Sequence, residues 1–445
     1  MTIASFIGPF MSSSVNVALP SIGKEFSMGA VSLGWINTAY LLAAATLLIP
    51  FGRMGDLYGK KRIFVIGLFL LMITSAILGS SLSGAMVIAG RVFQGVASAM
   101  LFATAMPILV SIVPPEMRGK AIGIVSGATY LGLSVGPLIG GLLTQQFGWR
   151  YVFWLYVPLA LILLALTYFM LEYHEEHSEK TKFDIVGSAI LGASLLLTMY
   201  GFSTLPSLLA GALTAAGIIG AIVFVMYESH TQAPLFDIDL FRRNAVFAFS
   251  SLAALINYAA TFAISFTLSL YLQQLRGLSP REAGLILVAQ PVMQAIFSPY
   301  AGKLSDRIQP RTLSSLGMAI DCLGLLMLAF ISQETSMVYI IGCLMILGFG
   351  FALFVSPNTN AIMSSVAKSS LGLAGATVGA VRQIGMMMSM GIVMMVLALF
   401  IGKAGIAPGN YEQFVQGLRI AFAVFAIACF GGVFASLARG KMKRG

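Results

Sequence analysis

Three charged residues stand inside long apolar stretches of this chain: Arg91, Asp321 and Arg382. A charge in such surroundings costs several kcal/mol unless it is paired or hydrated, so these residues point to function. Arginine binds anionic groups, whereas a buried carboxyl group can gain and lose a proton. We therefore predict that the three residues belong to a pathway for a substrate or a coupling ion.

Amide and phenol side chains occur in the same stretches and can supply hydrogen bonds to a ligand. Two arginines without an accompanying acid would make the pathway positive, which favours neutral amphipathic or anionic substrates over lipophilic cations. Besides the three charged residues, the candidates are Asn16, Asn37, Tyr40, Gln94, Tyr130, Asn257, Gln290 and Asn358, with Gln294, Asn360 and Gln383 as further polar neighbours.

Asp321 has two interpretations. As the only acid near the middle of an apolar stretch it can serve as a proton-coupling site. Alternatively, it is a neutral structural aspartate that is hydrogen-bonded to neighbouring helices.

A second set of residues forms a short basic turn that occurs twice, about half the chain apart. The first copy contains Gly52, Asp56, Gly59 and Arg62, and the second contains Gly302, Asp306, Arg307 and Arg311. Glycine allows close approach of helices, and an aspartate at a helix end can meet a helix N-terminus or an arginine. We expect a conformational gate in which Asp56 pairs with Arg118 or Arg62, and Asp306 with Arg307 or Arg311. The alternative is a pair of tight turns that only carry topogenic positive charge.

Composition places these residues in a membrane protein. Of 445 residues, 58% are hydrophobic and 9% are charged, against about 25% charged in soluble domains. Fourteen apolar stretches are long enough to span a bilayer, and each must be a helix because lipid cannot satisfy free backbone groups. The first lacks the basic leader and cleavage site of a signal peptide. We predict an all-α polytopic protein with fourteen transmembrane helices in a 6+2+6 order.

The distribution of positive charge sets the predicted orientation. Most of the 26 lysines and arginines fall on one side if the N-terminus is cytoplasmic, so both termini are expected there. The net charge of +10 is spread over loop ends beside lipid headgroups, so it indicates topology and no nucleic-acid partner.

The repeat and the spans predict three regions: a six-helix bundle at 1–172, linkers with two additional helices at 173–243, and a second six-helix bundle at 244–445. Secondary transporters are commonly built from two such halves. The polar tract around His174 and His177 offers no closed set of metal ligands, so we predict a solvated linker and no metal site. No phosphate-binding loop or catalytic constellation occurs, which argues against an enzyme or an ATP-driven pump.

These motifs resemble those of the major facilitator superfamily. The repeated turn, Arg91-Val-Phe-Gln-Gly95, and Gly148-Trp-Arg150 match its pattern, and Gly132, Gly136, Pro137, Gly140 and Gly141 resemble the antiporter signature of its exporters. With Val15-Asn-Val-Ala-Leu-Pro20, the fourteen spans narrow the resemblance to the fourteen-helix drug/proton antiporter group. The resemblance implies alternating access between two bundles in the cell membrane, with the glycine-rich helix bending or sliding against the opposite bundle.

One position departs from that group. Its first helix usually carries an acid a few residues before the Val-Asn-Val-Ala-Leu-Pro string, where this chain has Met11. We expect proton-coupled export of a small amphipathic, neutral or anionic compound, driven by the proton gradient without a cofactor. The alternatives are a proton-independent facilitator or exchanger of organic anions, and a membrane receptor or structural protein that does not transport. We expect the protein to contact a small-molecule substrate and the lipid bilayer, and to function as a monomer.

Overall fold

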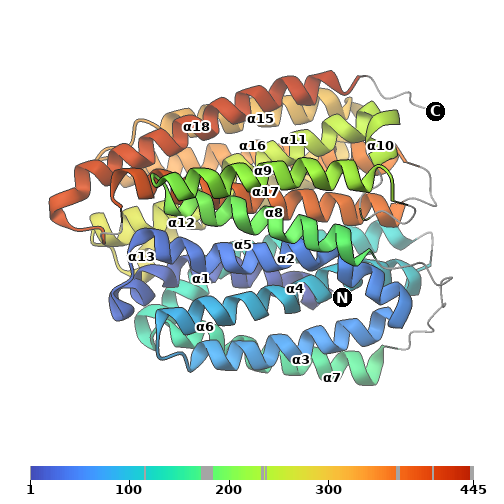
Figure 1. Cartoon of the computed structure of the whole chain (residues 1–445), viewed down its shortest axis with the longest axis horizontal. Coiled ribbons are helices and arrows are strands. Elements are labelled where there is room, and N and C mark those ends of the chain that lie inside the picture. Colours follow the sequence, from blue (N-terminus) through green and yellow to red (C-terminus); the bar gives the residue numbers. More distant parts are fainter. Residues whose placement is uncertain are drawn as a thin grey trace.

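The chain folds into long helices that run roughly parallel to one another (Figure 1). The computed structural model describes residues 2–114, 117–171, 184–231, 235, 238–366, 371–402 and 405–440. Within these residues, fourteen helical segments are long and apolar enough to cross a membrane. The predicted number of spans is thus confirmed.

The spanning segments are continuous helices or closely joined helix pairs. In chain order the elements are α1 (Thr2–Phe26), α2 (Ala30–Tyr58), α3 (Lys60–Gly79), α4 (Gly84–Ile112), α5 (Arg118–Gln146), α6 (Arg150–Trp154), α7 (Tyr156–Met170), α8 (Ile185–Thr204), α9 (Leu208–Glu228), α10 (Ile238–Arg243), α11 (Ala245–Thr261), α12 (Ile264–Leu270), the π-helix η2 (Tyr271–Leu275), α13 (Pro280–Leu287), α14 (Ala289–Arg307), α15 (Pro310–Leu328), α16 (Met337–Ser364), α17 (Leu371–Phe400), η4 (Pro408–Asn410) and α18 (Tyr411–Ala438).

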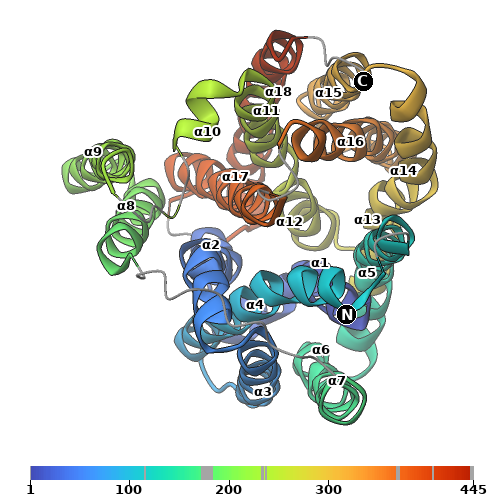
Figure 2. The same ribbon diagram turned by 90° about the vertical axis from the view of Figure 1, so that its right-hand side faces the viewer.

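Two bundles lie side by side, with α1–α7 in one and α11–α18 in the other (Figure 2). The two ends of the described chain lie on the same face, on the right of Figure 1. We call this the termini face and the opposite one the far face. The α8–α9 hairpin stands outside both bundles, where α8 contacts α2 and α17. The hairpin therefore covers the seam between the bundles on one side.

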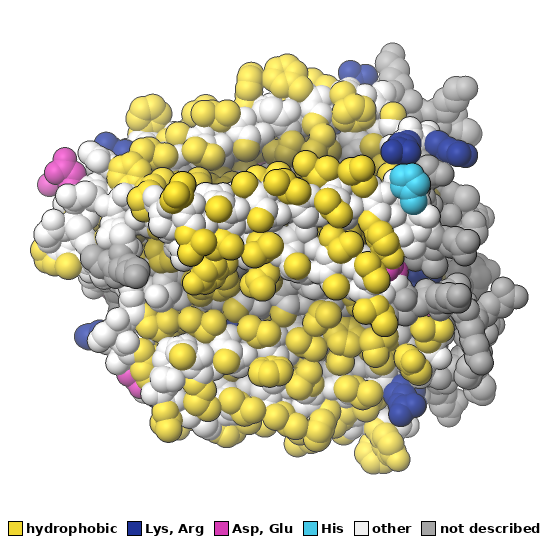
Figure 3. Space-filling view, in the orientation of Figure 1, with side chains coloured by type: hydrophobic (Ala, Val, Ile, Leu, Met, Phe, Trp, Pro, Cys, Tyr) yellow, Lys and Arg dark blue, Asp and Glu magenta, His cyan; other side chains and the backbone are white. Residues whose placement is uncertain are grey.

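The outer surface is apolar where the helices would meet lipid. Figure 3 shows hydrophobic side chains over the middle of one side and charged side chains near its two ends. Bulky residues such as Phe169, Leu208 and Phe330 are exposed, whereas Phe10, Phe266 and Phe422 are buried between helices. This arrangement suits a hydrocarbon layer flanked by polar headgroups.

The ninth span is broken near its middle. Helix α11 ends at Thr261 and α12 begins at Ile264, and the hydroxyl of Ser389 on α17 accepts a hydrogen bond from the backbone N–H of Ala263 at 3.0 Å. The π-helical turn η2 follows directly. Irregular backbone at membrane depth must be satisfied by protein groups, and here α17 supplies one of them.

Candidate functional site at the interface of the two bundles

Arg382 lies where the two bundles meet. It projects from α17 of the second bundle, and its guanidinium carbon lies 5.9 Å from the centre of the Phe102 ring on α4 of the first. The phenols of Tyr40, Tyr130 and Tyr258 lie within electrostatic range. Arg382 is partly exposed, and its buried Nε has no hydrogen-bond partner among the described residues. The guanidinium therefore has donor capacity available for a ligand.

Arg91 has a different environment. Its side chain is fully buried within the first bundle, where Nε donates to the carbonyl of Ile36 at 3.0 Å and Nη1 donates to Gln94 Oε1 at 2.6 Å. Its guanidinium carbon lies 4.2 Å from the ring centre of Tyr40. Gln94 in turn donates to Ser75 at 3.0 Å, which links α4 to α3. In this conformation Arg91 joins helices of one bundle, and Arg382 is the predicted arginine that reaches the interface.

Two hydrogen bonds from α12 and η2 to α1 join the bundles in the half of the protein nearer the far face. The hydroxyl of Ser269 on α12 donates to the carbonyl of Asn16 at 2.7 Å, and Nε2 of Gln273 donates to the carbonyl of Val17 at 2.9 Å. The same Nε2 lies 3.0 Å from the hydroxyl of Ser269. We call Ser269 and Gln273, with the two carbonyl groups of α1, the far-half latch.

Proline explains why α1 offers a carbonyl to the other bundle. Pro20 lies within α1 and has no N–H, so the carbonyl of Asn16, four residues earlier, has no partner in its own helix. Ser269 supplies that missing donor. The side chain of Asn16 instead accepts a hydrogen bond of 2.6 Å from Asn37 on α2. Asn16 and Pro20 of the Val-Asn-Val-Ala-Leu-Pro string thus position the contact between the bundles.

The glycine-rich helix α5 has two contact faces. A Cβ atom built on Gly132, Gly136 or Gly140 would collide with backbone of α1. One on Gly141 would lie 2.5 Å from the carbonyl oxygen of Pro280, at the start of α13. From the other side, Gly284 of α13 packs against the carbonyl of Pro137.

Because these glycines have no side chain, the backbone of α5 packs directly against α1 of its own bundle and against α13 of the other. Gly132, Gly136 and Gly140 fix α5 to its own bundle, whereas Pro137 and Gly141 lie against the other. The glycine and proline residues of the predicted antiporter signature therefore lie on two faces of α5, one against α1 and the other against α13.

Asp321 lies inside the second bundle, away from Arg382. It is fully buried on α15, and its Oδ2 accepts a hydrogen bond of 2.8 Å from Nδ2 of Asn257 on α11. Within the described part of the chain, Oδ1 of Asp321 has no hydrogen-bond partner, and neither has Oδ1 of Asn257. The sequence did not show that these two candidates form a pair.

Two of the remaining polar candidates, Asn358 and Asn360, hold helices together. Asn358 on α16 is buried and donates to the carbonyl of Ser250 on α11 at 3.0 Å. Asn360 donates to Ser305 at 3.2 Å. Gln290 is partly exposed on α14, and Gln294, one turn on, is buried with an unpartnered Oε1. Gln383 is buried beside Arg382 in the sequence.

The first repeated turn contains an ion pair that was not predicted. Asp56 pairs with Lys60 at 2.8 Å across Gly59, and the predicted pairing of Asp56 with Arg118 or Arg62 stays a prediction. A residue four positions away reaches the carboxylate more easily across the tight turn, where Gly59 has a φ of 102° that favours glycine. The side chains of Arg118 and Asp306 lie outside the described ones, so pairing through them stays a prediction.

The second turn lies near another arginine. Arg311, at the start of α15, approaches Arg439 at the end of α18. Burial, and to a smaller degree the charge of Arg311, lowers the pKa of Arg439 to about 10. Arg439 donates from Nε to the carbonyl of Ser436 at 2.8 Å and also bonds the Ser436 hydroxyl. Both turns lie on the termini face, as a gate on that side requires.

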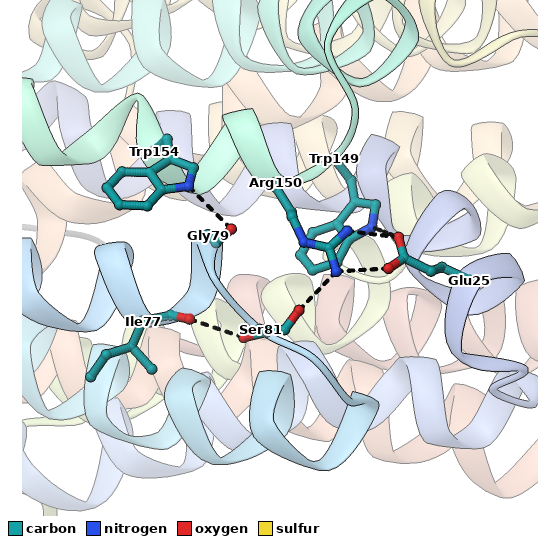
Figure 4. Close-up of polar contacts among 7 residues, drawn as sticks. All are labelled: Glu25, Ile77, Gly79, Ser81, Trp149, Arg150 and Trp154. Carbon is teal, nitrogen blue, oxygen red and sulfur yellow. Dashed lines mark hydrogen bonds and ion pairs between the residues drawn. The ribbon is translucent and has the colours of Figure 1, made fainter.

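The Gly-Trp-Arg motif forms a compact polar cluster at the far face (Figure 4). Arg150 binds both carboxylate oxygens of Glu25 at 2.7 and 2.8 Å, and Trp149 Nε1 donates to the same carboxylate at 2.8 Å. Arg150 also donates to the carbonyl of Ser81 at 2.8 Å. The cluster ties the end of α1 to the end of α3 and the start of α6.

Sequence reasoning missed Ser269, Gln273, Tyr258 and Phe102 as interface residues. Pro20 was a usable signal for the first of these, because it frees a carbonyl group that needs a donor. The pair Gln273-Gln274 near the end of a span was another. No sequence signal distinguishes Phe102 or Tyr258 from the other aromatic residues.

The fold and the interface site are those of a transporter built from two helical bundles. A family model, the Major Facilitator Superfamily, matches residues 1–228 and 250–443. The chain belongs to the Major Facilitator Superfamily. It is a multi-pass protein of the cell membrane and a transporter, not an enzyme.

Relatives of this chain include a transporter and a multidrug resistance protein. Riboflavin transporter RibZ of Clostridioides difficile (strain 630) is 29% identical over 385 residues, which cover 85% of this chain and 83% of that protein. Multidrug resistance protein Stp of Mycobacterium tuberculosis (strain CDC 1551 / Oshkosh) is 31% identical over 413 residues, covering 90% of this chain and 76% of that protein.

A solved structure shares the fold. The bacterial homolog of the human lysosomal transporter Spinster, in an inward-facing and unoccupied conformation, superposes with a TM-score of 0.68 at 16% identity. The match covers 98% of this chain and 96% of that one. At this identity the likeness concerns the fold alone.

Proposed function

We propose that this transporter exports a small amphipathic, neutral or anionic compound by alternating access, driven by the proton gradient. The observation that carries the proposal is Arg382, a partly exposed arginine between the bundles that no carboxylate of the described residues pairs with. A cationic substrate would be repelled there. An anionic or acceptor-bearing ring would gain charge-assisted hydrogen bonds and stack on the aromatic residues.

Export by proton exchange is supported by helix α5 and by the relatives. The two-faced helix α5 carries the glycine pattern of exporters, and relatives include a multidrug resistance protein and a riboflavin transporter. In the same proposal the termini face is cytoplasmic, in accord with the distribution of basic residues. Asp321 is the acid we assign to proton coupling.

A second candidate is a proton-independent facilitator or exchanger of organic anions. It is favoured by Met11, which is fully buried where the related antiporter group carries an acid. Uptake into proteoliposomes with and without a pH gradient separates the two candidates. Transport that is indifferent to the gradient would leave the facilitator as the function.

The role of Arg382 can be tested with flavins of different charge. Riboflavin is neutral and its 5′-phosphate is anionic, and ethidium serves as a planar cation. We expect thermal stabilisation by the neutral and anionic rings, and a loss of about tenfold or more in affinity for the anion in Arg382→Ala, because a hydrogen bond to a charged group contributes about 1.5–3 kcal/mol. Arg382→Lys should restore only part of it.

Lys24→Ala removes an exposed positive charge from the last turn of α1 and is the matched control. It should leave all three responses unchanged. Stabilisation by ethidium alone, or an Arg382→Ala protein that binds the anion as the wild type does, would contradict the proposed substrate class.

A further inference from the structure

We propose that Asp321 and Asn257 form a single proton-binding pair, and that α11 transmits its protonation to Arg382 at the interface. The inference rests on the proposed function and adds to it the location and the linkage of the coupling proton. The pair lies behind the wall of the interface, so the proton and the substrate would occupy separate positions.

Hydrogen-bond donors are too few in the pair as it stands. The carboxylate of Asp321 and the amide oxygen of Asn257 present three oxygen atoms, and the amide NH₂ serves only Oδ2 of Asp321, at 2.8 Å. Oδ1 of each residue is buried without a partner. A buried polar atom without a partner loses its hydrogen bonds to water and gains none in the protein, which destabilises that state.

One proton removes both deficits. A carboxylic acid and a primary amide can form a cyclic pair in which the acid O–H donates to the amide oxygen while the amide N–H donates to the acid. Protonating Asp321 on Oδ1 supplies that donor, and deprotonation removes it. The step is a simple proton transfer, in which one O–H bond forms or breaks and the group gains or loses one negative charge.

Among the residues that the structure describes, no cation pairs with the carboxylate of Asp321. The titratable groups that face Asp321 are two thiols, Cys322 on its own helix and Cys429 on α18. Helix α16 contributes Gly350, where a Cβ atom would lie 2.5 Å from Oδ1 of Asp321. Helix α11 contributes Asn257. An ionised carboxylate with no paired charge is strongly unfavourable in such a site, so its charge state must be tied to the packing around it.

Helix α11 connects this pair to the interface. Asn257 faces Asp321, and the next residue, Tyr258, faces Arg382. Helix α17 packs on the same segment through Gly385, where a Cβ atom would lie 2.7 Å from the carbonyl of Leu255 and 2.9 Å from Tyr258 Cβ. A shift of α11 when the acid–amide pair forms or opens therefore displaces the wall that holds Arg382.

The glycine contacts around the pair permit such a shift. A Cβ atom on Gly317 of α15 would lie 2.6 Å from both Gly350 O and Phe354 N, so α15 and α16 touch backbone to backbone. Surfaces without side chains can slide without unlocking interdigitated groups. The pair can thus open while the bundle stays packed.

The first test needs no transported ligand. Full-length protein carrying Tyr258→Trp is titrated with acid, and its indole fluorescence is compared with that of the unsubstituted protein, which contains Trp35, Trp149 and Trp154. Infrared difference spectra follow the carboxylic acid C=O band over the same titration. We expect a pH-dependent change in the added indole together with a titrating C=O band, and the loss of both in Asp321→Asn.

Two further variants keep the result interpretable. Asn257→Ala retains the carboxyl group and removes the amide, so it should shift the titration midpoint of the indole signal and move the C=O band. Glu412→Gln, at an exposed position on α18, is the matched control and should change neither the indole signal nor the C=O band that Asp321→Asn removes. An indole signal that titrates in Asp321→Asn as it does with Asp321 present, or is unmoved by Asn257→Ala, would overturn the inference.

Transport separates this inference from the function on which it rests. In proteoliposomes with riboflavin 5′-phosphate, Asp321→Asn should retain exchange at equal pH. The factor by which a pH gradient increases its transport should fall at least tenfold. If Asp321→Asn keeps that stimulation, the proton site is elsewhere and the proposed export stands. If transport by the unsubstituted protein is indifferent to the gradient, the proposed proton-driven function is wrong. The ligand-free titration then still tests whether Asp321 and Asn257 form a proton-binding pair.

Discussion

Arg91 and Arg382 show how its neighbours decide what an arginine within a membrane-spanning helix does. Both guanidinium groups lie near aromatic rings, Arg91 over Tyr40 and Arg382 near Phe102. Arg91 donates hydrogen bonds to a backbone carbonyl and to a glutamine inside one bundle. Arg382 keeps an unpartnered Nε at the interface. Only the second can offer its charge to a ligand without breaking contacts of the fold.

Gly350 allows a prediction about the Asp321 pair that concerns stability alone. Gly350→Ala places a methyl group against Oδ1 of Asp321, and overpacking of this kind costs typically about 1–3 kcal/mol. Gly342→Ala, on the same helix, has nothing within 4 Å of its new Cβ and should be neutral or gain up to about 1 kcal/mol of helix propensity. Thermal unfolding in detergent measures both. Equal melting temperatures for the two variants would contradict the tight contact at Gly350.

Helix contacts mark the limit of what the sequence could predict. Fourteen spans follow from apolar length, because lipid forces each stretch into a helix. The faces of those helices do not follow, since a membrane helix can be apolar on all sides. Hence Gly132, Gly136 and Gly140 could not be assigned to α1, nor Gly141 to α13, and Arg91 could not be placed inside one bundle.

Short-range polar contacts were predictable only where a local rule applied. Gly59 adopts the left-handed backbone conformation that a tight turn between two helices requires. Which basic side chain contacts the carboxylate of Asp56 depends on the length and direction of that side chain, and the spacing of the residues in the sequence does not determine this. The pairing of Asp321 with Asn257 joins α15 to α11, and no sequence rule links residues so far apart.

The far-half latch yields a prediction about α12 and η2 moving away from α1. Ser269→Ala with Gln273→Leu removes both donors to the carbonyl groups of Asn16 and Val17. Each bond contributes about 0.5–1.5 kcal/mol, so we expect the ratio of far-open to far-closed molecules to rise about tenfold. Spin labels at Gln145 and Arg281, exposed on opposite bundles, report the opening as a longer distance.

Gln416→Leu tests whether the chemical change alone has this effect. Gln416 is exposed on α18, so the substitution matches the one at Gln273 without touching the latch. The distance distribution should stay that of the unsubstituted protein. An unchanged distribution in the Ser269/Gln273 double variant would mean that the latch does not hold the far half closed.

The two bundles carry equivalent braces at the far face, as expected if each moves as a rigid body. In the first, Arg150 donates to the carbonyl of Ser81 at 2.8 Å. In the second, Arg419 donates to the carbonyl of Ile331 at 2.6 Å. Ser81 and Ile331 are 250 positions apart, the same spacing that separates Asp56 from Asp306. Each brace joins the exit of the third helix of its bundle to the sixth and does not cross the interface.

This difference between braces and latch leads to opposite expectations for their variants. Arg150→Ala should lower stability by about 1 kcal/mol, a modest loss because the Arg150 and Glu25 side chains are 32% and 41% exposed. It should leave the distance between labels at Gln145 and Arg281 unchanged, since alternating access rearranges bonds between bundles and preserves those within them. Arg419→Ala should behave alike. Should either variant shift the distance distribution as the latch variant does, the bundles bend internally during transport and rigid-body rocking is the wrong description.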